Sequence, residues 1–324
     1  MKTQITLPTT LLEAIRYFSD PDVCLEFVRE LRWPHGVECP HCGSEKVTFL
    51  KNARLWKCHT KHAKQKFSVK VGTIFEDSPI GLDKWLAAVW MIANCKNGIS
   101  SYEIHREIGV TQKTGWFMMH RIRLAMQTGS FKKFSGQVEA DETFIGGAAR
   151  NMHWRKKQAR EVKGRGSVGK TAVMGLLERH PRNGSQVKLT VVPNTRWNTL
   201  QRKVRENVER GTEMHTDALL SYTGLEHDYL HRVIDHAESY VKGHIHTNGL
   251  ENFWSLLKRG LKGTYVSVEP FHLFRYLDEQ TFRFNTRRGT NAERFAEVMQ
   301  MVAGKRLTYE KLTGKESGDG LLPS

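Results

Sequence analysis

Three cysteines in the first part of the chain, Cys39, Cys42 and Cys58, constrain the fold more strongly than any other feature of the sequence. The first two stand in a Cys-x-x-Cys turn, which presents two sulfur atoms to one tetrahedral Zn²⁺ ion. Cys24 and Cys95 bring the total to five, and an odd number in a large chain favours metal binding over disulfides. The sequence therefore predicts a zinc ribbon. The alternative is that these are ordinary buried cysteines without a metal.

A zinc ribbon needs a fourth ligand, and the second half of the motif is incomplete in this chain. Lys61 stands where a second Cys-x-x-Cys turn would place a cysteine, and it is flanked by His59 and His62. His62 follows Cys58 at a Cys-x3-His spacing, so we predict that His62 is the fourth ligand, with His59 as the alternative. Residues 36–75 are rich in Val, Phe and Thr with turn residues between them, which predicts short strands.

The chain of 324 residues carries a large excess of positive charge. Its 50 Lys and Arg residues outnumber its 34 Asp and Glu residues, which gives a formal net charge of +16. Such an excess favours a nucleic-acid partner over a merely soluble basic protein or one associated with ribosomes. No signal peptide is recognised, and the longest apolar run, residues 85–95, has about half the length that a bilayer requires. We expect a cytosolic protein of two or three structural units.

Helical patterns dominate the segments on either side of the cysteine region. Residues 9–33 place apolar positions at helical spacing, broken by Ser-Asp-Pro-Asp, which predicts two short helices. Three further helical patterns follow, separated by glycines. In the last two, Ser100 or Ser101 caps one helix, Gly109 allows a tight turn and Thr111 caps the next, which is the layout of a helix-turn-helix. A plain helical hairpin explains this pattern equally well.

Basic and polar residues in two segments are candidates for DNA contact. Three side chains on the second helix of the pair are predicted to be exposed and able to contact phosphates or bases: Gln112, Lys113 and Arg121. Residues 150–170 hold eight Lys or Arg residues and one Glu, which predicts a mobile basic loop along a DNA backbone. The candidates in this loop are Arg155, Lys156, Lys157 and Lys170.

The same basic loop contains a sequence that satisfies the phosphate-loop motif of nucleotide hydrolases. Residues 164–171, Gly-Arg-Gly-Ser-Val-Gly-Lys-Thr, fit the pattern G-x-x-x-x-G-K-[ST] in full. The motif has meaning only between a buried strand and a helix, and the preceding residues 153–163 are too charged for a buried strand. We therefore favour a DNA-binding loop, with a P-loop ATPase as the alternative.

Several carboxylates fall in positions that suit phosphoryl transfer. In the strand-like run over residues 137–145, Glu139 and Asp141 point to one face and Glu142 to the other. Asp217 ends a short run, and Glu251 falls on a later helix. An Asp within a strand, an Asp at a strand end and a Glu on a helix are what a two-metal site for phosphodiester chemistry needs. Any one of these acids alone is explained as a solvated acid or a helix cap.

Glu251 has two competing explanations. Asn248 precedes it by three residues at the start of an apolar helical pattern, which is the signature of a capping box. Lys258 follows Glu251 by seven residues, so the carboxylate and the ammonium lie on one helical face. We predict that Glu251 is a metal ligand first and that any capping role is secondary.

The motifs taken together resemble those of a bacterial insertion-sequence transposase of the ISXO-like type. The resemblance covers about residues 20–290 and rests on CPHCG, FSVKVGTIFEDSPIGLDKW, GISSYEIHREIGVTQKTGWFMMHRIR, ADETFIGG, HTDALLSY and TNGLENFWSLLKRGLKGTY with the later HLFRYLDEQTFRFN. It implies DNA transposition through a DDE-type triad, matched here by Asp141, Asp217 and Glu251, with Lys258 at the usual offset after the last acid. Arg259 is then a further DNA-binding candidate.

The resemblance also implies a fold, cofactors and partners. We expect an α/β, RNase H-like (integrase-type) catalytic domain with a mixed sheet and helices, behind a zinc ribbon and a helix-turn-helix. Two Mg²⁺ or Mn²⁺ ions per active site and one Zn²⁺ are implied, with double-stranded DNA as partner, namely the terminal inverted repeats and the target, bound by a homo-oligomer on the nucleoid. Some members of the group carry Asn in place of the third acid, which leaves Asn248 and Asn252 as minor candidates.

The expected division of the chain follows from these assignments. It comprises a helical lead-in over 1–35, the zinc ribbon over 36–78, the helix-turn-helix region over 79–130, the catalytic domain over 135–290, and a C-terminal helix with a disordered tail over 291–324. The alternative from another class is a DNA-binding regulator with an inactive integrase domain. Intact acids at all three positions weigh against it.

Overall fold

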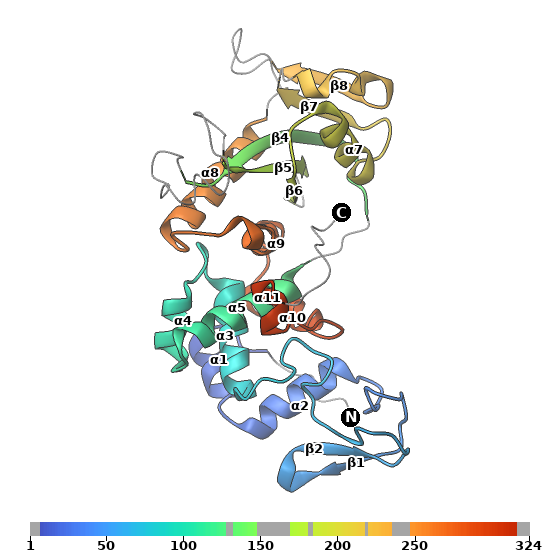
Figure 1. Cartoon of the computed structure of the whole chain (residues 1–324), viewed down its shortest axis with the longest axis vertical. Helices are drawn as coiled ribbons and strands as arrows, with labels where there is room; N and C mark the ends of the chain where they lie inside the picture. Colours follow the sequence, from blue (N-terminus) through green and yellow to red (C-terminus); the bar gives the residue numbers. More distant parts are fainter. Residues whose placement is uncertain are drawn as a thin grey trace. The chain divides into compact units, whose positions relative to one another are not determined.

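The computed structural model describes residues 7–127, 132–147, 169–180, 184–217, 220–234 and 247–315 (Figure 1). The chain divides into two compact units, which are treated separately below. Unit 1 comprises Met1–Gln127 and Gly289–Ser324, and unit 2 comprises Thr128–Arg288. Three of the predicted DNA-binding residues, Arg155, Lys156 and Lys157, lie outside the described residues, as does most of the C-terminal tail.

Unit 1 is mainly helical, and side chains that accept backbone hydrogen bonds start most of its helices. Ser100 caps one helix and Thr111 caps the next, while Gly109 between them has the left-handed conformation with φ of 61°. These contacts confirm the predicted helix boundaries and resolve the choice between Ser100 and Ser101. The helices are α1 (Leu11–Tyr17), α2 (Pro21–Arg32), α3 (Leu82–Asn94), α4 (Ser101–Ile108), α5 (Gln112–Met126), α10 (Asn291–Gln300) and α11 (Tyr309–Thr313).

The C-terminal segment folds back into unit 1. Phe295 on α10 stacks with Phe27 on α2 at a ring separation of 5.8 Å and meets Trp90 on α3 at 5.2 Å. The backbone N–H of Ile74 donates to the carbonyl of Val302 at 3.0 Å. Aromatic pairs of this kind add to the free energy of burial, so α10 completes a core that the N-terminal helices begin.

The cysteine region forms the predicted short strands. β1 (Val47–Leu50), β2 (Leu55–Cys58) and β3 (Lys66–Phe67) make an antiparallel sheet in the order β1-β2-β3. Trp56 and Phe67 from this sheet pack against Trp33 at the end of α2, with ring separations of 5.6 and 6.1 Å from Trp33.

Unit 2 is built on a five-stranded mixed sheet, in agreement with the predicted α/β class. Its strands run in the order β6-β5-β4-β7-β8 (Figure 1). β4 pairs antiparallel with β5 and β5 with β6, whereas β7 is parallel to both β4 and β8. The elements are β4 (Gln137–Ile145), β5 (Thr171–Glu178), β6 (Gln186–Val192), α7 (Trp197–Asn207), β7 (Glu213–Asp217), η3 (Leu220–Tyr222), η4 (Leu225–His227), β8 (Leu230–Ile234), α8 (Asn248–Gly263), η5 (Pro270–His272) and α9 (Leu273–Asn285).

Each face of this sheet has its own apolar cluster. Even-numbered residues of β4, Val138 and Ala140, join a cluster that includes Leu200 and Val204 of α7. The opposite face packs against α8 and α9 through a cluster that includes Trp254. Because alternate residues of a strand point to opposite faces, Glu139 and Asp141 lie on the α8 face and Glu142 on the α7 face, as predicted.

Gly175 of β5 sets how closely α8 approaches the sheet. A Cβ atom at this position would lie 2.5 Å from the Trp254 ring, a distance that side chains do not tolerate. We expect Gly175→Ala to lower the free energy of unfolding by about 1–3 kcal/mol, because it overpacks this contact. Urea unfolding followed by circular dichroism measures the change. Gly147→Ala, whose new Cβ would meet nothing within 4 Å, is the control, and equal stability of the two variants would contradict the argument.

Candidate catalytic and metal centres

The parallel pairing of β4 and β7 brings the first two predicted acids together. Ala140 lies opposite Thr216 in this pairing, so the next residues along the two strands are Asp141 and Asp217. Neighbouring residues at equal register in parallel strands point to the same face. Asp141 and Asp217 therefore start from adjacent positions on the face that α8 covers.

Helix α8 is fastened to this face by two contacts with acids of β4. The backbone N–H of Leu250 donates to Glu139 Oε2 at 2.8 Å, and Trp254 Nε1 donates to Asp141 Oδ2 at 2.9 Å. Glu139 is only 1% exposed, and Arg179 neutralises it through a 2.7 Å ion pair. A buried carboxylate at the start of a helix meets free N–H groups and the positive end of the helix dipole. This contact fixes the turn of α8 that carries Glu251.

The capping box that Asn248 and Glu251 offered as an alternative explanation does not form. The N-cap of α8 is Thr247, its side chain makes no capping hydrogen bond, and Asn248 is the first helical residue. The N–H of Glu251 donates to the Thr247 carbonyl as in any first turn, at 3.1 Å. Glu139 supplies the negative charge that a capping box would have supplied. Glu139 precedes Leu250 by 111 residues, so the local spacing around Asn248 and Glu251 could not indicate it as the partner of this helix start.

The three acids share one electrostatic environment. Burial is the main cause of the raised pKa of Asp141, and the negative charges of Asp217 and Glu251 raise it further. Hydrogen bonds from Trp254 and from the backbone N–H of Glu142 act in the opposite direction. Because like charges raise one another's pKa, a divalent cation among these oxygens would relieve the repulsion.

Glu142 is a fourth carboxylate in this region, and no role for it was predicted. It accepts a hydrogen bond from the hydroxyl of Tyr222, a fully buried residue in the turn after β7. Burial raises the pKa of Glu142 to about 8, with further contributions from the charges of Asp141 and Asp217. The signal available in the sequence was the density of acids within one strand, since three carboxylates in four residues put acids on both faces of the sheet.

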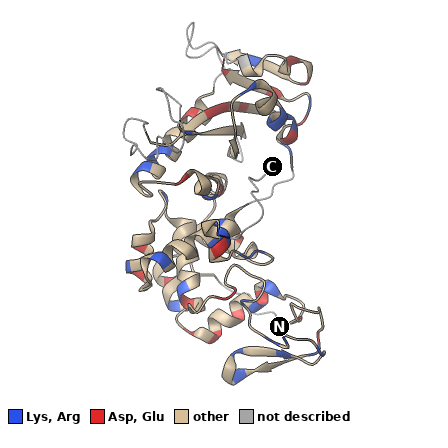
Figure 2. Ribbon diagram, viewed as in Figure 1, with Lys and Arg blue, Asp and Glu red and all other residues tan. Residues whose placement is uncertain are grey.

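The other candidates on α8 are exposed. Asn248, Asn252, Lys258 and Arg259 all lie on its solvent side, and so does Glu251. Lys258 and Arg259 follow Glu251 by about two helical turns, toward the end of α8, where Figure 2 colours the ribbon blue for Lys and Arg.

The predicted zinc ligands converge on one point. Ligand atoms of Cys39, Cys42, Cys58 and His62 all lie within 4.8 Å of one another. Cys39 Sγ is 3.4 Å from His62 Nε2, and Cys42 Sγ is 3.7 Å from Cys58 Sγ. Across the part of the chain that the structure describes, no other group of three or more potential ligands converges this closely. His59 Nε2 instead meets Thr48 Oγ1 at 2.8 Å, across the β1–β2 ladder.

The thiol chemistry of this quartet suits a metal. Burial raises the pKa of Cys58, but hydrogen bonds from His62, Thr60 and Cys42 outweigh it and lower the pKa to about 6. Since the thiolate is the form that binds Zn²⁺, Cys58 is prepared for coordination at neutral pH.

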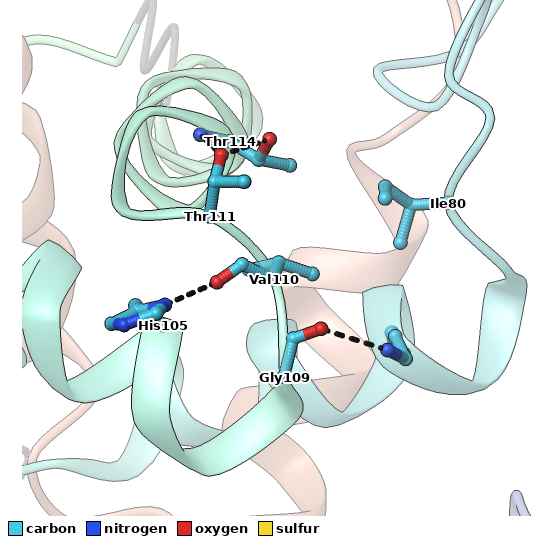
Figure 3. Close-up of a pocket in the computed structure, with 7 residues that line it drawn as sticks. Ile80, His105, Gly109, Val110, Thr111 and Thr114 are labelled. Atoms are coloured by element: carbon cyan, nitrogen blue, oxygen red, sulfur yellow. Dashed lines mark hydrogen bonds between the residues drawn. The ribbon is translucent and has the colours of Figure 1, made fainter.

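The two helices α4 and α5 are joined by a short turn whose polar groups are mostly used internally. Lys84 Nζ donates to the Gly109 carbonyl at 3.1 Å, and a His105 ring nitrogen meets the Val110 carbonyl (Figure 3). Gln112 is half-buried with its amide on Ser101, whereas Lys113 is exposed with its ammonium over the Tyr309 ring. An open hollow beside the turn is lined by Ile80, Lys84, His105, Gly109, Val110, Thr111 and Thr114.

The expectation that Arg121 is exposed is wrong. It is 4% exposed and donates to the carbonyls of Leu307, at 3.0 Å, and Glu76, at 2.5 Å. The folded-back C-terminal segment supplies Leu307, so a position that looks exposed on an isolated helix becomes buried. Arg121 is a structural residue of unit 1.

The P-loop alternative fails on local structure. Thr171, the last residue of the motif, begins β5, whereas a phosphate loop must lead into a helix. Lys170 is half-buried and packs against Gly146 at the end of β4. Residues 164–168 lie outside the described part of the chain.

Comparison with known proteins identifies the class of both regions as transposase domains. Residues 133–285 match the ISXO2-like transposase domain family, and residues 19–60 match the transposase zinc-ribbon domain family. Two regions of the chain therefore match the zinc-ribbon and transposase domains of insertion-sequence transposases, in agreement with the predicted resemblance.

One relative of the chain belongs to a mobile element. An uncharacterized protein in transposable element ISH50 of Halobacterium salinarum is 25% identical over 257 residues, which cover 76% of this chain and 85% of the relative. Among the helices that the structure describes, none combines the length and the apolar composition needed to span a membrane.

The choice between His62 and His59 can be tested by zinc affinity. We expect His62→Asn to weaken zinc binding by the full-length protein by at least about 100-fold, since even outer-shell changes at metal sites cost 10–100-fold. Competition with a chromophoric chelator gives the affinity. His59→Asn is the matched control and should bind zinc like the unmodified protein. A larger loss in the His59 variant would reverse the assignment.

The raised pKa of Glu142 predicts a pH-dependent stability. The folded protein keeps a proton on Glu142 that the unfolded chain releases above pH 4.5, so raising the pH favours unfolding. This contribution is fully present below pH 4.5 and is lost as the pH rises through about 8. Glu142→Gln, which stays neutral, should show a flatter dependence of urea midpoint on pH in the presence of EDTA. Parallel profiles for the two proteins would contradict the prediction.

Proposed function

We propose that this protein is a DNA transposase that binds the ends of its mobile element and carries out metal-dependent DNA cleavage and strand transfer. One observation carries the proposal: Asp141 and Asp217 start from adjacent positions on parallel strands, and the charge of Glu251 on the docked helix acts on the same carboxylate. A fold of the RNase H-like type is inferred from the transposase-domain match and from the mixed sheet that α7 covers on one face and α8 on the other.

The donor set fits Mg²⁺ or Mn²⁺. Three carboxylates offer the hard oxygen ligands that these ions prefer, and their mutual repulsion would fall when a cation binds. When bound, two such ions would activate a water molecule or a DNA 3′-hydroxyl and stabilise the leaving oxygen of the phosphodiester. Asp141, Asp217 and Glu251 are the residues that would hold these ions.

The surrounding residues orient the acids. Both oxygens of Asp141 are held, Oδ2 by Trp254 at 2.9 Å and Oδ1 by the backbone N–H of Glu142 at 2.8 Å. The contact of Leu250 with Glu139 holds the first turn of α8, so Glu251 has a fixed starting point. Such preorganisation lowers the cost of reaching a productive geometry.

Exposed cations on α8 are suited to the DNA strand that is being cut. Lys258 and Arg259 lie about 10–12 Å along the helix from Glu251, at a rise of about 1.5 Å per residue. We propose that they hold phosphates near the scissile bond and steer the strand toward the acids.

DNA-end recognition is assigned to unit 1, in the zinc ribbon and the α4–α5 pair acting as a helix-turn-helix. Lys113 is the exposed candidate there, and Gln112 would contact DNA after releasing Ser101. The basic loop with Arg155, Lys156, Lys157 and Lys170 is proposed to follow the DNA backbone. The protein would act on double-stranded terminal repeats and target DNA as a homo-oligomer, in the cytoplasm on the nucleoid.

Glu251→Gln tests the catalytic assignment. Gln has nearly the same shape but no charge, so we expect normal folding and DNA binding with a loss of Mg²⁺-dependent cleavage and strand joining of more than about 100-fold. Asp141→Asn and Asp217→Asn should behave in the same way. The substrate is a labelled duplex that contains the DNA flanking the gene, and the products are resolved on a denaturing gel.

Two neighbouring asparagines supply matched controls. Asn248→Ser and Asn252→Ser change exposed positions on the same helix and should keep strand joining within about twofold, well inside the effect of losing a metal ligand. Near-normal joining by Glu251→Gln together with failure of an asparagine variant would move the third ligand to that asparagine.

A further inference from the structure

The connection between α8 and α9 holds a valine in a strained and exposed conformation. Val266 has φ of 61°, and its side chain is 79% exposed. The N–H of Ser267 donates to the carbonyl of Tyr265 at 2.6 Å, so Val266 is the central residue of a γ-turn with positive φ. Such turns are rare, and a β-branched residue with positive φ is an outlier.

The residues on either side of the tip are firmly anchored. Tyr265 and Val268 pack against the apolar cluster of α8 and α9. The Tyr265 hydroxyl donates to Glu279, which is buried and also paired with Arg283. Tyr265 also meets the Tyr276 ring edge-on at 4.8 Å. Because both flanks are fixed, the fold pushes Val266 outward instead of letting the turn relax.

The same connection exposes a second apolar side chain and follows a basic helix end. Phe271 in η5 is 60% exposed. From Lys258 to His272 the sequence contains Lys258, Arg259 and Lys262 against one acid, Glu269. A backbone strained at an exposed site is expected where the strain serves a function.

We propose that the α8–α9 connection is a DNA wedge, in which Val266 and Phe271 enter a base step beside the cleavage site and unstack it. This inference rests on the proposed function and deepens it. Proteins that distort DNA insert apolar side chains between bases while cations hold the neighbouring phosphates. The exposed side chains of Val266 and Phe271 alone offer too little area for a stable protein interface, which needs about 800 Å² on each partner.

Helix geometry limits where the wedge can act. Twelve residues separate Glu251 from Gly263 at the end of α8, which corresponds to about 18 Å. At about 3.4 Å per base pair, the wedge reaches a step within roughly five base pairs of the scissile phosphate. Unstacking there would free the strand end to enter the carboxylate site.

The test combines a fluorescent base with two variants of the full-length protein. 2-Aminopurine, whose emission rises when it leaves the base stack, is placed in turn at each of the first six positions beside the cleavage site. The unmodified protein should raise the emission at one of these positions. Val266→Gly combined with Phe271→Ala should abolish that rise and lower strand joining by roughly tenfold, because unstacking then lacks its compensating contact. Trp197→Ala, at an exposed apolar residue on α7, is the control and should change neither the 2-aminopurine emission nor the strand joining.

A mismatched base pair at the responsive step gives the decisive comparison. A mismatched pair costs less to unstack than a matched one, so the double variant should join this DNA within about twofold of the unmodified protein. Val266→Gly alone should also raise the melting temperature by roughly 2–4 °C, because glycine accepts positive φ without strain.

Each contrary result has a distinct meaning. Unchanged emission and joining in the double variant would overturn the wedge, and so would an equal loss on matched and mismatched DNA. If the double variant loses joining equally on both DNAs and also changes its oligomeric state on a sizing column, the α8–α9 connection is a contact between copies of the protein. Failure of the unmodified protein to cleave or join any of these duplexes with Mg²⁺ would count against the proposed function itself, and the emission change would still report on the wedge.

Discussion

The contact between the buried carboxylate of Glu139 and the first turn of α8 is the interaction on which the rest of unit 2 depends. Glu139 lies on the sheet, and the backbone N–H of Leu250 lies on the helix. Arg179 balances the buried negative charge of Glu139. Gly249 is part of this arrangement, because a Cβ there would come within 2.8 Å of both carboxylate oxygens. Breaking a buried pair of this kind leaves an uncompensated charge, which is far more costly than losing a surface ion pair.

Several features of the site could be predicted because they depend on local chemistry. The alternation along β4 separates Asp141 from Glu142, and the spacing of Cys39, Cys42 and Cys58 has few explanations other than a metal site. The caps at Ser100 and Thr111 are equally local, since each side chain bonds to a backbone N–H three residues later.

The features that sequence reasoning missed all depend on contacts between distant residues. Arg121 is buried because the carbonyl of Leu307 arrives from the far end of the chain. Glu139 takes the place of a capping box because the first part of β4 lies under the first turn of α8. No local sequence pattern indicates such distant partners. Considered without these partners, Arg121 on its helix and Glu139 on its strand are indistinguishable from ordinary exposed charges. The raised pKa of Glu142 has the same origin, because Tyr222 and the burial around it come from the turn after β7.

The return of the chain into unit 1 has a consequence for the order in which the protein becomes active. Unit 1 is complete only when α10 has contributed Phe295 to the aromatic cluster with Phe27 and Trp90. Because ribosomes synthesise proteins from the N-terminus, the whole of unit 2 is made before the last piece of unit 1. A chain interrupted after unit 2 would hold the proposed metal-binding acids without a finished unit 1. The core of unit 1 can therefore be completed only after the whole of unit 2 has been synthesised.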